Sequence, residues 1–354
     1  MIKWTKSPHQ DFTKDMRGWP QGKTRKHTKT EIKRIKEIHQ ELAKDKKEFF
    51  AGASAIIQKW LEEYPDIQPP YPKFIGRVLK AAGRTEKIQK GRNKGASRYL
   101  HYPEYSIGQI GESLLEIDFI GKKFIRGRTE PLNFIGFSLR KPCKLKHFRR
   151  ITGETGSNVI KESKRFFKKF EKPDTVKMDN GFATYGGGQH KRLLTKAIIF
   201  YLKEQVIPIF APPRKPWSQA SIEGSNSVFS RKFWNKEDFE NLPYLDERLR
   251  AFNKCYQWYL GYRPPKQRTK KENFIPKVYF IRKVYQNPEI EKGYIDVANE
   301  HISIPKFYIN LFTLSEWNLK QEQLYIYFEN EEKLELIKKL SFKLHSNSKE
   351  KLFN

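Results

Sequence analysis

The chain has 354 residues, with 70 Lys and Arg against 40 Asp and Glu, a formal net charge of +30 and 14% aromatic residues. This composition excludes a disordered tail and leaves room for two or three folded domains. It has no apolar run of 18 or more residues, no secretion signal and two distant cysteines, which excludes a membrane span, a disulfide framework and a cysteine zinc site. We therefore expect a cytoplasmic protein.

The excess of positive charge is spread along the whole chain. An extended polyanion is the natural partner for such a chain, because each neutralised phosphate releases condensed counterions. The plainer alternative is lysine enrichment from an AT-rich genome. We expect nucleic-acid binding.

The N-terminal region begins with a basic arm over 1–28, and then repeats apolar residues at helical spacing. Helices are predicted over 30–46, 54–63 and 73–82, the last ended by Gly83. The third would bury Phe74, Ile75, Val78 and Leu79, and would expose Lys73, Gly76, Arg77 and Lys80. We predict a helix-turn-helix over 29–83 in which Lys73, Arg77 and Lys80 contact DNA. An ordinary three-helix packing unit is the alternative.

A basic linker is expected over 84–108, and the rhythm then changes to strands alternating with helices. Strands are predicted over 113–121, 134–140, 143–150, 175–179 and 206–210, and helices over 154–170, 189–204, 218–234 and most of 238–260. This order predicts an α/β core over 109–262, built on a mixed five-stranded sheet covered by helices. A connector over 263–276 and a small β-barrel of short strands over 277–354 would follow.

Three acids stand out by their place in this pattern: Asp118 within the first core strand, Asp179 at the end of "TVKMD", and Glu223 on the helix after "PPRKPW". In an open α/β sheet, reactive side chains gather where strands end and helices begin. Three converging carboxylates would repel each other and DNA unless divalent cations lay between them. Mg²⁺ prefers such oxygen ligands, and two ions can activate an attacking oxygen and stabilise a leaving one.

The blocks "LLEIDFIG", "KMDNG" and "PPRKPWSQASIEGSN" resemble the three signature blocks of the DDE integrase and transposase superfamily, which has a ribonuclease-H-like core. The match is closest to bacterial insertion-sequence transposases with a retroviral-integrase-type core. "PYPKFIGRVLKAAG" resembles their N-terminal helix-turn-helix, and "YRPPKQ" resembles the connector after the core. The resemblance covers roughly residues 30–340.

The resemblance implies that Asp118, Asp179 and Glu223 hold two Mg²⁺ ions, with Mn²⁺ as a substitute. It also implies cleavage and strand transfer of double-stranded DNA at terminal inverted repeats and a target, by a homo-oligomer at a prokaryotic nucleoid. The chain departs from the family at Phe182-Ala183-Thr184, at Gln219-Ala220 and in an insertion over 182–192.

Each assignment has an alternative. Glu116 shares a strand face with Asp118 and would be either the ligand or an edge charge. Asp179 suits an Asx-turn, and Glu223 suits a solvent-facing helix acid, with Glu204 as a weaker substitute. We also expect Lys215, Trp217, Asn226 and Arg231 to contact DNA, against the alternative that they are exposed polar residues.

Two other functions stay open. One is a catalytically inactive helix-turn-helix regulator, and the other is a ribonuclease-H-like nuclease that cleaves strands without joining them.

Overall fold

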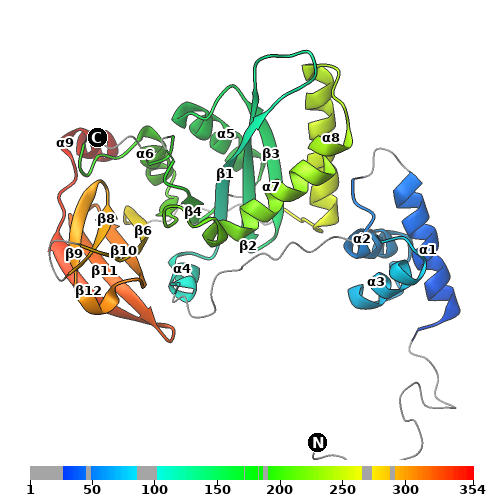
Figure 1. Cartoon of the computed structure of the whole chain (residues 1–354), viewed down its shortest axis with the longest axis horizontal. Coiled ribbons are helices and arrows are strands. Elements are labelled where there is room, and N and C mark those ends of the chain that lie inside the picture. Colours follow the sequence, from blue (N-terminus) through cyan, green and yellow to red (C-terminus); the bar gives the residue numbers. More distant parts are fainter. Residues whose placement is uncertain are drawn as a thin grey trace, which may run out of the picture. The chain divides into compact units, whose positions relative to one another are not determined.

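The computed structural model describes residues 27–44, 49–85, 102–170, 172–181, 183–185, 190–264, 273–287 and 292–354. The chain divides into two compact units, of which the first comprises Met1–Lys44 and Ala51–Glu86 and the second Asp45–Phe50 and Lys87–Asn354 (Figure 1). The basic arm up to residue 26, the linker over 86–101 and the connector over 265–272 lie outside the described residues. Within the described part of the chain, no helix is both long and apolar enough to cross a bilayer.

The first unit contains the three expected helices, α1 (Lys29–Lys44), α2 (Ala53–Glu63) and α3 (Pro72–Ala81). A capping box starts α1: the Thr28 N–H donates to Glu31 Oε2 at 2.7 Å, and the Glu31 N–H donates to Thr28 Oγ1 at 3.1 Å. The unit has its own core, in which Ile35, Trp60 and Ile75 are fully buried. It can therefore bury apolar surface without the second unit.

The faces of α3 lie as its sequence predicts. Ile75, Val78 and Leu79 are buried, whereas Lys73, Arg77 and Lys80 are exposed. Phe74 is half-buried and stacks on His27 with ring centroids 3.7 Å apart. The connection from α2 to α3 runs over 64–71, which is longer than the three- to four-residue turn of a typical helix-turn-helix. The DNA contacts of α3 stay a prediction.

The second unit is a mixed α/β structure built on a nine-stranded sheet with the order β12-β11-β10-β6-β5-β4-β1-β2-β3. Its first five strands in sequence are β1 (Leu114–Lys123), β2 (Leu132–Lys141), β3 (Leu145–Ile151), β4 (Thr175–Met178) and β5 (Ile207–Phe210). β1 is antiparallel to β2 and parallel to β4, and β5 is parallel to β4. The predicted mixed five-stranded sheet is therefore present as part of a larger one.

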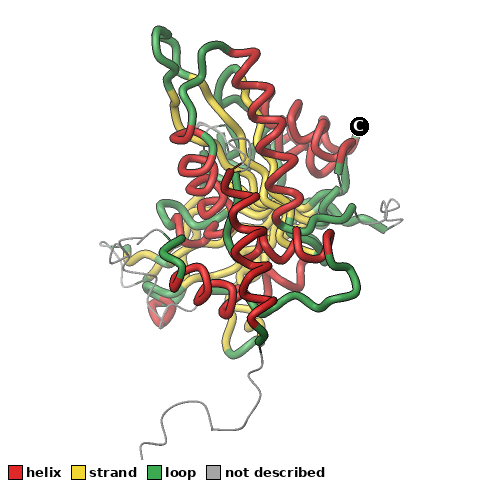
Figure 2. The backbone as a smooth tube through the Cα atoms, turned by 90° about the vertical axis from the view of Figure 1, so that its right-hand side faces the viewer, coloured by secondary structure: helices red, strands yellow, loops and turns green. Residues whose placement is uncertain are grey.

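Helices pack on both faces of these strands, and Figure 2 shows the helices in red and the strands in yellow. The covering helices are α5 (Gly156–Lys169), α6 (Lys196–Lys203), α7 (Ala220–Lys232) and α8 (Leu242–Tyr259). Successive side chains of β2 point to opposite faces of the sheet, so its aromatic rings pack on different helices. Phe137 stacks on Phe166 of α5, whereas Phe134 packs on Phe229 of α7.

The C-terminal strands continue the core sheet, whereas the sequence predicted a separate small barrel. They are β6 (Lys277–Lys283), β7 (Tyr285–Gln286), β8 (Gly293–Val297), β9 (Glu300–Ile304), β10 (Phe312–Asn318), β11 (Gln323–Asn330) and β12 (Lys333–Ser341), followed by α9 (Ser346–Phe353). β6 pairs in parallel with β5, and β10, β11 and β12 follow it, while β7, β8 and β9 form a second sheet. The strands are short and consecutive, as in a barrel, but β6 pairs with β5 and so covers what would otherwise be an open edge of the core sheet.

Two predicted boundaries are also different. Helix α4 (Glu104–Ile110) begins within the expected linker over 84–108. A hydrogen bond from the Ser106 N–H to Glu329 Oε2, at 2.6 Å, holds it in place. Helix α6 begins at Lys196 and not at residue 189, because the Thr195 hydroxyl caps it by accepting from the Ile198 N–H. Residues 186–189 lie outside the described part.

The segment between α1 and α2 contributes two aromatic rings to the second unit. Phe49 packs edge-on against Phe252 of α8, with centroids 5.1 Å apart, and Phe50 stacks on Tyr259 at 4.3 Å. Both phenylalanines are buried. They complete an aromatic cluster on the side of α8 that faces the core.

Candidate carboxylate site on the sheet

The three acids singled out by the sequence lie on neighbouring elements of the second unit. Asp118 is in the middle of β1, opposite Gly136 of β2. Asp179 directly follows β4, which is the parallel neighbour of β1. Glu223 is in the first turn of α7, the helix that covers β1 and β2. The fold thus brings together side chains that are far apart in the sequence.

The electrostatics of Asp118 show that these carboxylates act on one another. Burial is the largest cause that raises the pKa of Asp118 to about 7, and the negative charges of Asp179 and Glu223 contribute to the same rise. Burial also raises the pKa of Glu223, with a second contribution from the charge of Glu116. Placing several negative charges in one partly buried region is costly, and this cost is typical of functional sites.

Asp179 is held in a tight turn. Its Oδ1 accepts from the Gly181 N–H at 3.1 Å and from the Thr184 hydroxyl at 3.3 Å. The Asx-turn weighed as an alternative is therefore present, and Thr184 occupies a place for which the sequence suggested no role. Residue 182 of the same loop lies outside the described part.

Arg282 of β6 supports the next residue of this turn. Its Nη2 donates to Asn180 Oδ1 at 2.8 Å, and its Nη1 donates to the Ala211 carbonyl at 3.3 Å, next to β5. Arg282 is buried, and burial lowers the pKa of its guanidinium. A C-terminal strand thereby fixes the end of β4 at the position where Asp179 lies.

The residues predicted to contact DNA near Glu223 lie in different environments. Asn226 donates its Nδ2 to Asp118 Oδ2 at 2.9 Å, so in this structure it orients a carboxylate. Arg231 is exposed and Lys215 is partly exposed. Trp217 packs edge-on against Tyr102 and Phe312, with centroids 5.1 and 5.6 Å away, and is a packing residue. DNA contact by Lys215, Asn226 and Arg231 stays a prediction.

Glu116 is neither an edge charge nor an open ligand. It is fully buried, its Oε2 accepts from the Ile222 N–H of α7 at 2.9 Å, and its Oε1 accepts from Arg140 at 3.3 Å. A carboxylate that accepts a backbone N–H in the first turn of a helix also stabilises the positive end of the helix dipole. Glu116 therefore anchors the turn that carries Glu223.

Two buried lysines hold the same stretch of chain. Lys146 of β3 donates to Ser221 Oγ at 2.7 Å, and Lys177 of β4 donates to the Ser218 carbonyl. Burial lowers the pKa of both amines, to about 8 for Lys146. Sequence reasoning missed these residues, because a lysine inside a short strand reads as an exposed charge. Glu116, Lys146 and Lys177 form a buried polar row that fixes residues 218–222.

Gly136 explains how α7 comes so near to Asp118. A Cβ at this position would lie 3.0 Å from Asn226 Oδ1 and 3.1 Å from Ile222 Cδ1. A larger residue here would push α7 away from the sheet.

The carboxylate oxygens of the site are donors that a hard divalent cation prefers. Their spacing fits such a cation less closely. Among the described residues, no three His, Cys, Asp or Glu side chains are arranged to hold one metal ion together. Mg²⁺, however, is usually bound through one or two carboxylates and the phosphates of its substrate. Asp118 and Asp179 are two carboxylates of the kind that Mg²⁺ prefers, and the charge of Asp179 acts on Asp118 more strongly than that of Glu223.

The fold and the site define a mixed α/β protein with coupled carboxylates at the meeting of β1, β4 and α7. Among known proteins, no family model and no curated sequence matches the chain. Among solved structures, it is similar to a chain of the simian T-cell lymphotropic virus intasome in complex with PP2A regulatory subunit B56 gamma. The two are 12% identical with a TM-score of 0.35, over 81% of this chain and 92% of that one.

Proposed function

We propose that this protein is a DDE-type polynucleotidyl transferase, a transposase or integrase that cleaves DNA ends and transfers the resulting strands. The observation that carries the proposal is the electrostatic coupling of Asp118 with Asp179 and Glu223, the three acids that the sequence blocks single out. A ribonuclease-H-like core, an N-terminal DNA-recognition unit and basic C-terminal strands complete the proposal. The charge of +30 supports a DNA substrate.

Asp118 and Asp179 would hold Mg²⁺, with Glu223 as the third carboxylate, and Mn²⁺ would substitute. The bound metal supplies Lewis-acid activation of an attacking oxygen and stabilisation of the leaving one. Asn226 keeps Asp118 in one orientation through its 2.9 Å hydrogen bond. The buried row of Glu116, Lys146 and Lys177 holds the start of α7, so that Glu223 meets the phosphodiester from a fixed direction.

The test is a strand-cleavage and strand-joining assay on duplex DNA that carries the inverted repeats flanking the gene. The wild-type protein should nick these ends and join them to a target only with Mg²⁺ or Mn²⁺. Asp118→Asn, Asp179→Asn and Glu223→Gln should each reduce both steps by at least about 10²-fold, because each removes a carboxylate that would hold the metal. Asp238→Asn, which removes the charge of an exposed acid of the second unit that belongs to no proposed site, is the matched control and should retain activity.

The assay also separates the alternatives. An inactive helix-turn-helix regulator would bind the ends without metal-dependent nicking. A ribonuclease-H-like nuclease would cleave an RNA–DNA hybrid and yield no joined product. Either pattern in the wild-type protein would refute the proposal.

Pairing of two DNA ends requires at least a dimer on DNA, and we propose such a homo-oligomer at a prokaryotic nucleoid. Size-exclusion chromatography with light scattering, with and without end DNA, tests this part separately from the chemistry.

A further inference from the structure

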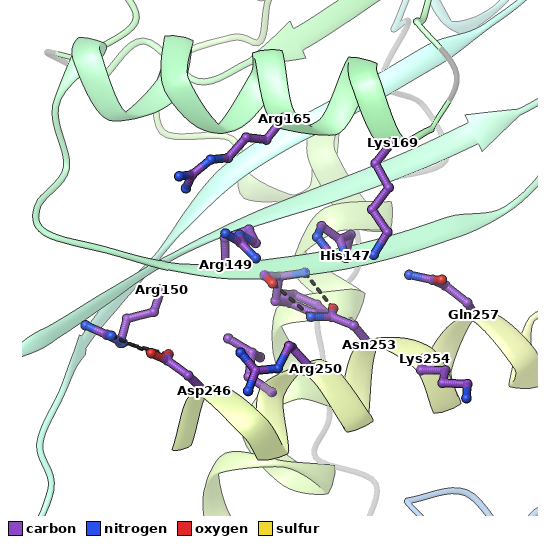
Figure 3. Close-up of a pocket in the computed structure, with 12 residues that line it drawn as sticks. His147, Arg149, Arg150, Arg165, Lys169, Asp246, Arg250, Asn253, Lys254 and Gln257 are labelled. Carbon is purple, nitrogen blue, oxygen red and sulfur yellow. Dashed lines mark hydrogen bonds and ion pairs between the residues drawn. The ribbon is translucent and has the colours of Figure 1, made fainter. Parts of the chain in front are cut away.

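A cationic groove lies at the edge of the sheet formed by β3, α5 and α8. It encloses about 510 Å³. In Figure 3, Arg165 and Lys169 extend from α5 on one side, Arg250 and Lys254 lie on α8 on the other, and β3 runs between them. None of these residues belongs to the carboxylate site.

The edge of β3 is closed at the floor of this groove. The Phe148 N–H donates to Asn253 Oδ1 at 2.8 Å, and Asn253 Nδ2 donates to the Phe148 carbonyl at 2.9 Å. The side-chain amide thus takes the place of a neighbouring strand. Both residues are buried. The backbone groups of Phe148 are therefore already hydrogen-bonded, so another strand cannot pair with β3 at this residue.

The groove carries more positive charge than its acids neutralise. Arg150 is paired in a bidentate manner with Asp246, at 2.9 and 2.6 Å. Arg149 and Arg165 share one carboxylate, that of Glu162, at 3.2 and 2.7 Å. Lys169, Arg250 and Lys254, all exposed, add three more charges. Six cations thus face two carboxylates.

His147 lines the groove with only 7% of its surface exposed, and its Nδ1 has no hydrogen-bond partner among the described residues. Burial is the largest cause that lowers the pKa of His147 to about 3, and the charges of Lys169 and Arg149 contribute, so the imidazole is neutral at physiological pH. Its ring packs against Phe166 and Phe170, with centroids 6.3 and 5.1 Å away, so His147 adds no charge to the groove.

We infer that this groove binds the phosphate backbone of DNA at a place separate from the carboxylate site. Arg165 and Lys169 are four residues apart on α5, as are Arg250 and Lys254 on α8, so each pair places two charges about 6 Å apart along its helix. Two rows of cations on facing helices match an extended polyanion, whose charges recur along a line, better than a compact one. Only the choice of DNA as the polyanion rests on the proposed function.

The test measures binding of a fluorescent 30-base-pair duplex to the full-length chain by anisotropy at several salt concentrations. The variant is Lys169→Gln/Arg250→Gln/Lys254→Gln. It should bind at least about tenfold more weakly near 0.1 M salt, and its log–log salt slope should be shallower by about 2 to 3, since each phosphate contact contributes about 0.9 to the slope. If the triple variant does not fold, Lys169→Gln and Lys254→Gln singly should each flatten the slope by about 1.

The matched control removes the same charge from another exposed place in the second unit, with Lys191→Gln/Lys196→Gln/Lys203→Gln at and before α6. Equal losses in the two triple variants would mean that only net charge matters and would overturn the inference. Tripolyphosphate is the second arm: if it displaces the duplex more effectively per phosphate than unlabelled DNA does, the groove serves a compact ligand and the inference fails.

The outcome is separable from that of the proposed function. A wild-type protein without metal-dependent cleavage, whose groove variant still loses DNA affinity, would refute the proposed function and leave the groove. An active wild-type protein whose groove variant binds DNA like the control would support the proposed function and refute the inference about the groove.

Discussion

The N-terminal helices and the C-terminal strands read alike in the sequence, as two DNA-binding modules flanking a core, but they differ in how they are built. The first form a compact unit with a core of their own around Ile35, Trp60 and Ile75. The second share the sheet of the core, through β6 on β5, and its apolar cluster, which includes Val278 and Phe280.

The difference shows that a flanking segment can be part of the scaffold that holds the carboxylate site. Arg282 of β6 reaches Asn180, the residue after Asp179, so a C-terminal strand shapes the carboxylate site directly. Phe49 and Phe50, which precede α2 in the sequence, belong to the second unit and pack on α8. We therefore expect the two ends of the chain to respond very differently to perturbation.

The largest expected effect comes from truncation. A chain ending at residue 264 loses β6 to β12, which uncovers the edge of β5 and the apolar residues that β6 and β10 bury, so it should fail to fold cooperatively. A chain starting at residue 102 loses the first unit and the rings of Phe49 and Phe50, and its Tm should fall by about 5–10 °C. Thermal unfolding of both chains, followed by circular dichroism, measures these two effects. A cooperative transition in the chain that ends at residue 264 would contradict the comparison.

The next effect concerns the buried guanidinium. Arg282→Met should lower the free energy of unfolding by about 2–4 kcal/mol, because Asn180 Oδ1 and two backbone carbonyls lose a buried donor. Urea unfolding followed by fluorescence measures this loss. Arg34→Met in the first unit is the control: Arg34 lies over the ring of Tyr64 at 4.4 Å and should cost no more than about 1 kcal/mol. Equal losses in the two variants would show that the buried hydrogen bonds of Arg282 add no more stability than the ring contact of Arg34.

Much of the local structure could be predicted from periodicity, whereas the long-range pairing could not. The apolar spacing in α1 and α3 and the short apolar runs of β4 and β5 indicated these elements to within a few residues. The pairing of β6 with β5 had no local signal, since any strand with an apolar face can satisfy an open edge. Helix α4 was missed because its basic, Gly- and Pro-containing surroundings resemble a linker.

The same contrast holds for the site. Asp118, Asp179 and Glu223 could be singled out because strand ends and helix starts are visible in the sequence. Glu116 was named only as an alternative ligand or an edge charge, and Lys146 and Lys177 were not singled out, because the roles of all three depend on burial under α7, which only the fold provides. Sequence therefore indicated which groups repel one another, and the structure added what holds them in place.

A pH experiment separates the two units, because Asp118, Asp179 and Glu223 all belong to the second one. The pKa of Asp118 in the folded protein, about 7, lies above its ordinary value of 3.8. The folded state therefore binds the extra proton between these values, and its stability falls as pH rises from about 4 to 7. Asp118→Asn should remove this decline and be about 1–3 kcal/mol more stable than wild type at pH 8 without metal.

Urea unfolding at pH 4 and pH 8 measures this gap, which should close at the lower pH. Asp66→Asn, an exposed acid of the first unit, is the control and should leave the pH dependence unchanged. A gap of the same size at pH 4 would show that the gain comes from the asparagine itself. The absence of any gap at pH 8 would show that Asp118 bears no electrostatic cost.

The smallest effect on stability, and the one that isolates the first unit, is expected on α3. Arg77 is exposed, and its guanidinium lies over the ring of Phe74 on its own helix, at 6.0 Å. Arg77→Gln should therefore change the free energy of unfolding by less than about 0.5 kcal/mol. If α3 contacts phosphates, the same variant should flatten the salt slope of DNA binding by about 1. The neighbouring Gly76→Ala adds a side chain to open space on the same helix, and it tests whether bulk alone on this face disturbs binding. Full DNA affinity in Arg77→Gln at every salt concentration would leave the first unit as a packing module, and recognition of DNA would then rest with the second unit.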